Sequence, residues 1–404
     1  MNDPTTSRRA VSAVAQPVRG GLPVKRAVAG FAAASLLLTG CSTNFSGTQN
    51  DDNKQAAEQP VAGTPATPAQ SPKAGTDLSG KAVSLPFGSD TQILDAATVS
   101  IKPDQGQASS AILIKGALYL AASDKLEEAK KVELNDSCDN LNTTATGVGV
   151  GCDDEYLELD AKGETLRKIE VEGHVKSGTT TADGDTVIGV DGQDKIGFYG
   201  DDGKRASDEV VSRSLDATVL VPGRENGPRV AVIDRGQTTI NDVDPAKREY
   251  KASLRIGQGV GEVAASTGDD AVVVASDNRQ DQVMLYTMDD VVRLHQTAPT
   301  GKSPWGVAWD AQRKVALVST TADNTLTAYD VATGTPMKVG SWKTIADVRH
   351  VLVQPDGSVL VVGKNNQAQL IAANEVEKSI SEGKSAGPSK DEEFPVELKG
   401  SENK

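Results

Sequence analysis

Short apolar runs recur along this chain at a spacing of about 43 residues. One run covers residues 315–318, an earlier one covers 272–274, and a still earlier one covers 230–233. Each run is followed, after a polar turn, by a segment in which apolar and polar side chains tend to alternate. A continuous apolar run is typical of a strand buried on both faces, and alternation is typical of a half-exposed strand. The pattern therefore predicts pairs of β-strands repeated along the chain.

A repeat of about 40–45 residues that contains several short strands is typical of a β-propeller blade. We therefore expect an all-β fold in which residues 87–380 form a β-propeller. The observed spacing divides this region into about seven units, so seven blades are predicted, with six or eight as alternatives. A β-sandwich with the same strand spacing is the other fold that the pattern allows. Closing the ring is expected to need a strand from the segment that precedes residue 87.

The N-terminal residues have the composition of an export signal. Five basic side chains precede an apolar run over residues 27–38, and Leu38-Thr39-Gly40-Cys41 ends this run. The last four residues resemble the bacterial lipobox. The resemblance implies that Cys41 receives a diacylglycerol thioether and that residues 1–40 are a signal peptide cleaved before it. A free cysteine after an ordinary apolar segment is the alternative.

Polar segments flank the predicted propeller. Residues 41–86 are rich in Gln, Asn, Ala, Thr, Ser, Pro and Gly and show no apolar period, so a flexible linker is expected after the lipidated cysteine. Residues 381–404 read as a polar tail, in which residues 394–398 have the composition of one additional closing strand. The twin-arginine-like pair Arg8-Arg9 lies far from the apolar run, so export by the general secretory route is favoured.

The repeats resemble a known propeller family. Pro304-Trp305-Gly306-Val307-Ala308 is followed by a valine-rich strand and then by Asn-Thr-Leu at 324–326. These residues resemble the YVTN-type propeller repeat, strongly over residues 257–365, moderately back to 178 and faintly before that. Together with the lipobox, the resemblance implies an envelope lipoprotein of the actinobacterial, high-GC Gram-positive type. It implies an architecture and leaves the activity open.

The net charge excludes one class of partner. The chain has 42 Lys and Arg against 56 Asp and Glu, for a net charge of −14. Because residues 1–40 carry a net +4, the predicted mature chain carries −18. Nucleic-acid binding needs a basic footprint, and an acidic chain with only 3% aromatic residues lacks it. Membrane attachment is therefore expected to rest on the acyl chains, and not on a basic patch.

Two cysteines remain besides Cys41. Cys138 and Cys152 would both lie outside the cytoplasm after export, in a compartment where paired cysteines form disulfides. A Cys138–Cys152 disulfide is therefore predicted. A redox or metal-binding pair is the alternative, although the chain has no Cys-x-x-Cys and no histidine nearby in sequence.

The repeat register also points to a candidate binding site. In a propeller the innermost strands line a central channel, and the residues entering those strands surround its mouth. Glu262, Trp305, Arg349 and His350 occupy such positions, so a ligand site at the channel mouth is predicted from these four side chains. Val-Arg-His at 348–350, followed by Pro-Asp-Gly at 355–357, also resembles one repeat of the lactonase-type propellers. In that family an Arg and a His at these positions face the sugar-lactone site. A hydrated channel with one polar residue per blade is the alternative.

The sequence contains no complete catalytic or metal-binding set. His174, His295 and His350 fall in different repeats, which disfavours a zinc site. Acidic pairs such as Asp201-Asp202 lie in predicted turns, where Asp usually hydrogen-bonds the backbone, and calcium binding there stays open. We expect no cofactor.

These features favour a binding or scaffold module that is anchored in the cell membrane and faces outside the cytoplasm. Its partner is expected to be another envelope protein or a cell-wall or lipid component, and the propeller itself is expected to be monomeric. One alternative is a lactonase-like hydrolase that uses the central channel through Arg349 and His350. Another is a ligand-sensing lipoprotein.

The substitution Cys41→Ala tests the predicted anchor. Without the thiol no acyl chain is attached, so the protein should move from the membrane fraction to the soluble fraction, as measured by cell fractionation and immunoblotting. Continued retention in the membrane fraction would refute the anchor.

Overall fold

The computed structural model describes residues 63–101, 107–223, 225–268, 270–332 and 334–386. The predicted signal peptide, Cys41, the first part of the linker and residues 387–404 of the tail lie outside this range and stay predictions. Among the described residues, no helix is both long and apolar enough to cross a membrane.

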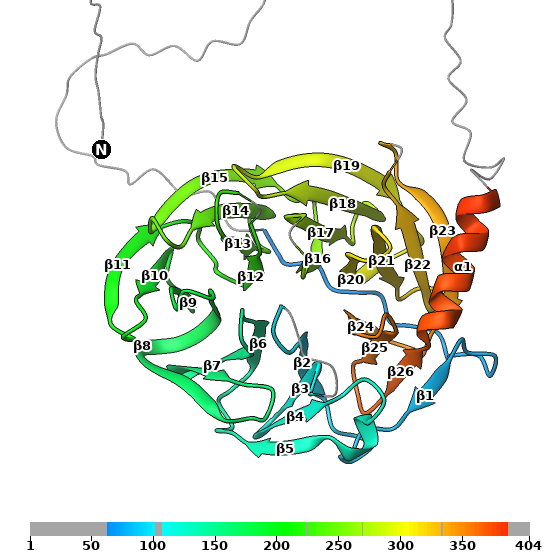
Figure 1. The fold of residues 1–404 in the computed structure, drawn as a ribbon, viewed down its shortest axis with the longest axis horizontal. Helices are drawn as coiled ribbons and strands as arrows, with labels where there is room; N and C mark the ends of the chain where they lie inside the picture. The colour runs from blue at the N-terminus through cyan, green and yellow to red at the C-terminus, as the bar shows by residue number, and fades with distance from the viewer. Residues whose placement is uncertain (1–62, 102–106, 224, 269, 333, 387–404) are drawn as a thin grey trace, which may run out of the picture. The chain divides into compact units, whose positions relative to one another are not determined.

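Antiparallel sheets follow one another around a ring, so the prediction of an all-β propeller is confirmed (Figure 1). The first sheet consists of β2 (Ile93–Thr98), β3 (Ser110–Ile114), β4 (Ala117–Ala121) and β5 (Lys130–Glu133), with the 3-10 helix η1 (Leu126–Glu128) before β5. The second consists of β6 (Asn140–Thr143), β7 (Val148–Leu159), β8 (Thr165–Thr180), β9 (Thr186–Val190), β10 (Lys195–Tyr199) and β11 (Arg205–Val210). The third consists of β12 (Ala217–Val221), β13 (Arg229–Asp234), β14 (Thr239–Asp244) and β15 (Glu249–Arg255).

The remaining sheets have four strands each. The fourth consists of β16 (Val260–Ala265), β17 (Val272–Asp277), β18 (Gln282–Thr287) and β19 (Arg293–Pro299). The fifth consists of β20 (Pro304–Asp310), β21 (Val315–Thr320), β22 (Thr325–Asp330) and β23 (Met337–Lys343). The sixth consists of β24 (Val348–Val353), β25 (Val359–Gly363), β26 (Ala368–Ile371) and the N-terminal strand β1 (Lys81–Val83).

The number of blades differs from the prediction of seven. The described residues form six sheets, and one of them is six strands wide. The reason is β8, which pairs with β7 through residues 165–174 and with β9 through residues 175–180, so that no break separates two successive repeats. Seven strands nevertheless line the channel, because the wide sheet contributes both β6 and β8. The repeat spacing therefore predicts the number of channel strands and misses the fusion of two repeats into one sheet.

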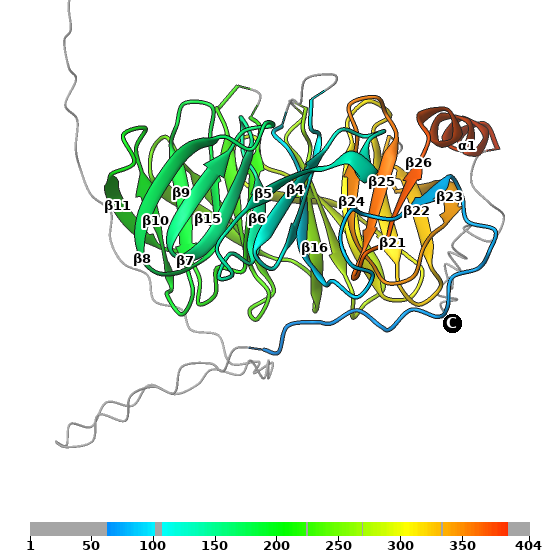
Figure 2. The same ribbon diagram turned by 90° about the horizontal axis from the view of Figure 1, so that it is seen from below.

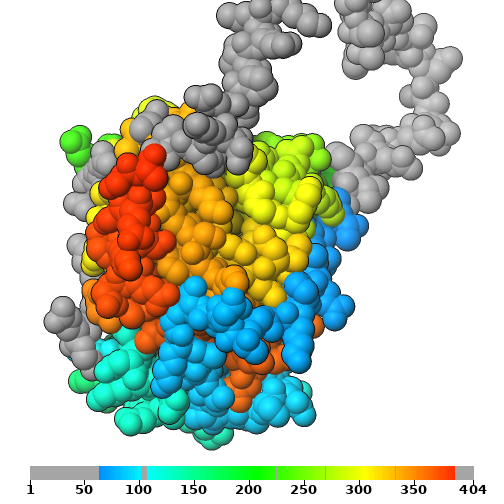
Figure 3. All heavy atoms as spheres, turned by 90° about the vertical axis from the view of Figure 1, so that its right-hand side faces the viewer, coloured from blue at the N-terminus to red at the C-terminus, as the bar shows by residue number. Residues whose placement is uncertain are grey.

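The last sheet is completed by the N-terminal segment. β1 pairs antiparallel with β26, and Lys81 lies opposite Leu370 while Val83 lies opposite Ala368. This is the closing strand that the sequence pattern expected from residues before 87. Val83 and Leu85 are buried in a cluster that holds side chains of both the last and the first sheet. Figure 3 shows this N-terminal segment, in blue, lying against the orange last sheet beside the cyan first one.

The apolar core lies between neighbouring sheets. One cluster joins Leu317 and Leu326 of the fifth sheet to Val359 and Val361 of the sixth. These residues come from the continuous apolar runs. Such runs are needed because a central strand of each sheet faces a neighbouring sheet on both sides.

Part of the predicted flexible linker is docked on the ring. Residues 63–76, which we call the strap, run along one face of the ring before the chain reaches β1 (Figure 2). The strap is bound through its backbone and through short polar side chains such as Ser71. Such contacts leave no apolar period in the sequence, so the docking was not expected.

The C-terminal end of the described chain is a helix that the sequence analysis missed. α1 (Ala373–Ala386) covers the start of the region read as a polar tail. Only Val376 and Ile380 are buried, and they pack against Val339 and Trp342 of β23. Two apolar residues four positions apart are too few to reveal an amphipathic period.

Substitution of Val83 tests ring closure by β1. Val83→Ala removes two buried methyl groups between the last and first sheets, and it should lower the free energy of unfolding by about 1–2 kcal/mol, measured by urea denaturation. Lys81→Ala, at an exposed position two residues earlier in the same strand, is the matched control and should have little effect. Equal stability of both variants would show that β1 does not secure the ring.

Candidate functional site

β-bulges occur in five of the seven strands that line the channel, namely β2, β8, β16, β20 and β24. The pairing of these strands with their neighbours shifts register at Leu94, at Lys176, between Val260 and Val263, between Pro304 and Val307, and at Arg349. A bulge inserts an extra residue and redirects the side chains beside it. Glu262, Trp305 and Arg349 lie in these bulges, and His350 is the next residue after one.

Serine side chains of the second strands stabilise two of the bulges. The Ser276 hydroxyl accepts a hydrogen bond from the backbone N–H of Glu262 at 3.1 Å and donates to the Trp305 carbonyl at 2.6 Å. In the next sheet Ser319 accepts from the backbone N–H of Gly306 at 2.9 Å. The same residue type thus holds the irregular backbone in two successive repeats and fixes the direction of Glu262.

The channel contains a cavity of about 510 Å³. Its wall combines apolar side chains such as Leu220, Val307 and Trp309 with polar side chains such as Asn142 and Thr218. A group of polar and charged side chains lies at the starting ends of the channel strands and in one turn beside them. We call this group the charged mouth, and it consists of Asp95, Lys176, Asp216, Arg235, Glu262 and His350. A ligand pocket usually combines apolar surface with converging polar groups, and this cavity has both.

Opposite charges are paired within the charged mouth. Arg235 Nη2 lies 3.3 Å from Glu262 Oε1, and Arg235 Nη1 also donates to the Gly261 carbonyl. His350 Nδ1 lies 3.6 Å from Asp95 Oδ1. Asp95 Oδ2 accepts a hydrogen bond from the Leu141 backbone N–H at 3.0 Å, which ties the first sheet to the second. Lys176 forms no ion pair with any residue in the described part of the chain.

Burial shifts the protonation of two of these groups. Burial, assisted by the negative charge of Glu262, raises the pKa of Asp95 to about 7. Burial lowers the pKa of His350 below its usual value. Near neutral pH the neutral imidazole therefore lies beside a carboxyl group that is half protonated. Perturbed pairs of this kind are concentrated at functional sites.

The structure places the four predicted residues in two groups. Glu262 and His350 line the cavity. Trp305 and Arg349 are not among the lining residues; Trp305 lies against Gly261 of the neighbouring strand, and Arg349 Nη2 lies 3.5 Å from Asp347 Oδ1. Arg349 is still near enough to Glu262 for their charges to interact, and burial lowers the pKa of its guanidinium. The four-residue ligand site itself stays a prediction.

The sequence analysis missed four residues of the charged mouth: Asp95, Lys176, Asp216 and Arg235. Asp95 is the third residue of its channel strand, as Glu262 and His350 are of theirs, but the first repeat is too degenerate for this register to be read. Arg235 lies in the turn between β13 and β14, and it reaches the channel from outside the inner strand. A comparison of turn residues between repeats would have been the only signal for it.

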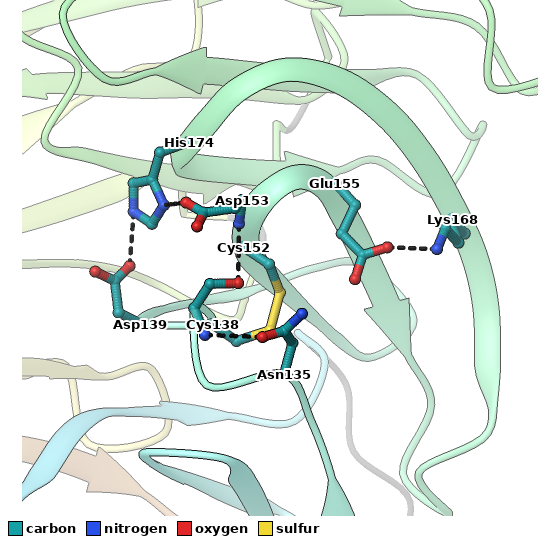
Figure 4. Close-up of a disulfide and its surroundings, with 9 residues drawn as sticks. Asn135, Cys138, Asp139, Cys152, Asp153, Glu155, Lys168 and His174 are labelled. Carbon is teal, nitrogen blue, oxygen red and sulfur yellow. Dashed lines mark hydrogen bonds and ion pairs between the residues drawn. A yellow bond between two sulfur atoms is a disulfide. The ribbon is translucent and has the colours of Figure 1, made fainter.

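The predicted disulfide between Cys138 and Cys152 is present (Figure 4). It joins the segment entering β6 to β7, and both cysteines are fully buried. Beside it His174 bridges two carboxylates: its Nδ1 lies 2.8 Å from Asp153 Oδ1, and its Nε2 lies 3.0 Å from Asp139 Oδ1. Each aspartate directly follows one cysteine, so the imidazole reinforces the covalent link.

Metal binding finds no support in this part of the chain. Within residues 63–386, apart from the gaps stated above, no three His, Cys, Asp or Glu side chains are grouped as metal ligands. Asp277, like Asp234, accepts hydrogen bonds from backbone N–H groups of the segment that enters its own sheet. These acids serve as turn caps.

Comparison with known proteins identifies the fold. No family model matches the chain, and no curated protein matches it. A chain of the mitotic checkpoint complex is similar with a TM-score of 0.56 and 12% identity, over 80% of this chain and 98% of that one. The WD40 domain of Neurospora crassa Pan2 gives a TM-score of 0.56 at 11% identity, over 74% of this chain and 97% of that one. The WD40 propeller domain of Doa1 gives 0.52 at 13% identity, over 73% and 97%.

This chain is a β-propeller. At such low identity the likeness to WD40 propellers shows the fold alone and transfers no ligand or partner. The lipobox, YVTN and lactonase resemblances rest on the sequence motifs alone.

The raised pKa of Asp95 predicts a pH-dependent effect on the propeller. In the unfolded chain this carboxyl has its ordinary pKa of 3.8, and in the folded chain about 7, so folding retains a proton between these values. The stabilising contribution is therefore complete below about pH 4 and is lost as the pH rises through 7. Asp95→Asn does not titrate, so its stability relative to the wild type should improve by about 4 kcal/mol from pH 4 to pH 8.

Urea denaturation at several pH values measures this difference. Thr98→Val, a neutral change on the same channel strand, is the control and should shift the unfolding free energy equally at every pH. A pH-independent difference between Asp95→Asn and the wild type would contradict the shifted pKa.

Proposed function

We propose that this β-propeller is a lipid-anchored binding module of the cell envelope, which binds a ligand or a partner segment at the charged mouth. The observation that carries the proposal is the cavity of about 510 Å³ with a wall of mixed apolar and polar side chains and a charged entrance. Propellers commonly serve as binding or scaffold modules, and their rigid rings suit the presentation of such a site. The export signal and lipobox support the location outside the cytoplasm.

The composition of the charged mouth indicates the chemistry that it suits. Lys176 supplies a cation that is not engaged by a carboxylate among the described residues, and Glu262 shares its charge with Arg235. His350 supplies a neutral imidazole. A ligand with a charged or hydrogen-bonding end and a body that carries both apolar and polar groups would match the mouth and the wall together. The acidic surface of the mature chain supports a partner that is not a nucleic acid.

The hydrolase alternative is less well supported by the geometry. It needs Arg349 and His350 to face one substrate, and only His350 lines the cavity. Arg349 is turned toward Asp347, with an N–O distance of 3.5 Å. The ligand-sensing alternative uses the same cavity as the binding proposal, and stabilisation of the protein by a ligand would be its sign.

Photocrosslinking in cells tests the binding function. A photoreactive residue at Ala217, which lines the cavity, should capture a discrete species that mass spectrometry identifies. Glu262→Gln in the same background should reduce the captured amount about tenfold, because it removes one charge of the mouth. Glu133→Gln is the matched control, since its side chain is 77% exposed on β5, far from the channel in sequence and in the sheet order.

Two results would overturn the proposal. Capture that is equal in the Glu262→Gln and Glu133→Gln variants would show that the charged mouth is not the binding site. Hydrolysis of a lactone panel by the purified protein at enzyme-like rates, with loss of activity in His350→Ala, would favour the hydrolase.

A further inference from the structure

The strap crosses the ring at its four-stranded sheets. Gly63 N–H donates to the Gly236 carbonyl at 3.1 Å, and Arg279 donates to the Thr64 carbonyl at 2.6 Å. These contacts lie in the turn between β13 and β14 and the turn between β17 and β18. The strap thus begins beside Arg235, a residue of the charged mouth.

The middle of the strap continues across the next two sheets. Ala69 N–H donates to the Ser303 hydroxyl at 2.8 Å, and Asn324 donates to the Pro72 carbonyl at 2.9 Å. The Ser71 hydroxyl donates to the Thr321 carbonyl at 2.7 Å and accepts from the Asp347 backbone N–H at 2.8 Å. The contacts come from turns between strands and from segments entering the channel strands, so the strap follows the end of the ring at which the charged mouth opens.

One strap residue forms part of the cavity wall. Pro65 is among the residues lining the cavity, together with Glu262 and Arg235. The next residue, Ala66, is buried beside Gly259, where an added Cβ would lie 3.0 Å from the Ala66 Cβ. The strap therefore closes part of the entrance to the charged mouth.

The strap is held much less firmly than the segment that follows it. Within residues 63–76 only Ala66 is buried, and the remaining attachment consists of separate hydrogen bonds. Residues 78–87 contribute Leu78, Val83, Leu85 and Phe87 to two apolar clusters and add β1 to the last sheet. Segments with few buried apolar contacts open locally at small free-energy cost, without unfolding the rest of the protein.

We propose that residues 63–72 are a releasable cover over the charged mouth, and that their detachment opens the cavity while β1 keeps the ring closed. The covered surface is continuous with the predicted tether, because 21 residues separate Cys41 from Gly63. Release of residues 63–76 would add 14 residues to the predicted tether between Cys41 and the ring. A pull from the membrane anchor would peel the cover from the end nearest the mouth. The idea that tension on the membrane anchor releases the strap rests on the proposed function. The proposal that the strap covers the charged mouth does not rest on it.

Thiol accessibility measures the opening. The probe is Ala217→Cys, at the first residue of β12 and on the cavity wall, in a chain with Cys41→Ser and the native disulfide intact. The reagent is N-ethylmaleimide, and the rate of alkylation is followed by mass spectrometry. Lys204→Cys, whose native side chain is 83% exposed, gives the rate of a fully accessible thiol.

Two independent variants weaken the attachment of the strap, one by a change in the strap and one by a change in the ring. Ser71→Ala removes both hydrogen bonds of the Ser71 hydroxyl. Asn324→Gly removes the bond to Pro72 and keeps a residue that tolerates the positive φ of 52° at this turn. Each should accelerate alkylation of Cys at position 217 about tenfold, since the open fraction rises when hydrogen bonds of the closed state are lost. Thr67→Ala, at an exposed strap residue, should leave the rate unchanged.

Hydrogen exchange provides the second measurement. Amides of residues 63–76 should exchange faster in the two release variants, while those of residues 78–87 keep the wild-type rate. Identical alkylation rates in all variants would overturn the cover. Parallel acceleration of exchange in both segments would also overturn it, because release would then require loss of β1. Neither measurement uses a ligand or a lipid, so a failed crosslinking experiment and a failed cover are distinguishable.

Discussion

Closure of the ring by β1 is the constraint on which the rest of the molecule depends. A row of sheets has two exposed ends, and only pairing between distant parts of the chain joins them. Here three residues of β1 complete the last sheet, and Val83 and Leu85 fill the space toward the first sheet. The cavity exists because all seven channel strands are held at a common distance from one axis. Asp95 of the first sheet and His350 of the last meet across this junction, 3.6 Å apart. The candidate site is therefore a product of closure as much as of its own residues.

The repeats position the site through short polar side chains. Ser276 and Ser319 hold successive bulges, and Asp234 and Asp277 cap the segments that enter their sheets. These residues contribute little apolar area, yet they fix where the backbone departs from regular pairing. Because charged residues of the mouth lie at or next to those departures, local irregularity of the strands becomes an ordered group of charges at one end of the channel.

The sequence predicts the parts of this fold that depend on apolar burial. Strands such as β21 and β25 face neighbouring sheets on both sides, and that requirement produces the repeated apolar runs that identify the propeller. The register of the clearest repeats also placed Glu262 and His350 correctly on the channel wall. The position of Arg235 at the cavity could not be predicted, because its long side chain reaches the cavity from a turn. The docking of the strap could not be predicted, because backbone hydrogen bonding imposes no pattern on side chains. The six-stranded sheet could not be predicted either, because an uninterrupted β8 keeps the same spacing as two separate blades.

Successive repeats are joined differently on the two sides of the ring. In the wide sheet, β8 runs unbroken from one repeat into the next, and the Cys138–Cys152 link with its bridging His174 lies at the entry to that sheet. On the other side, the separate four-stranded sheets are spanned by the strap (Figures 1 and 2). The first arrangement joins two repeats by one unbroken strand, and the second adds strap hydrogen bonds to separate sheets that are already packed through apolar clusters. Successive repeats of the same ring are thus joined in two ways, by a continuous backbone on one side and by side-chain packing with a strap across it on the other.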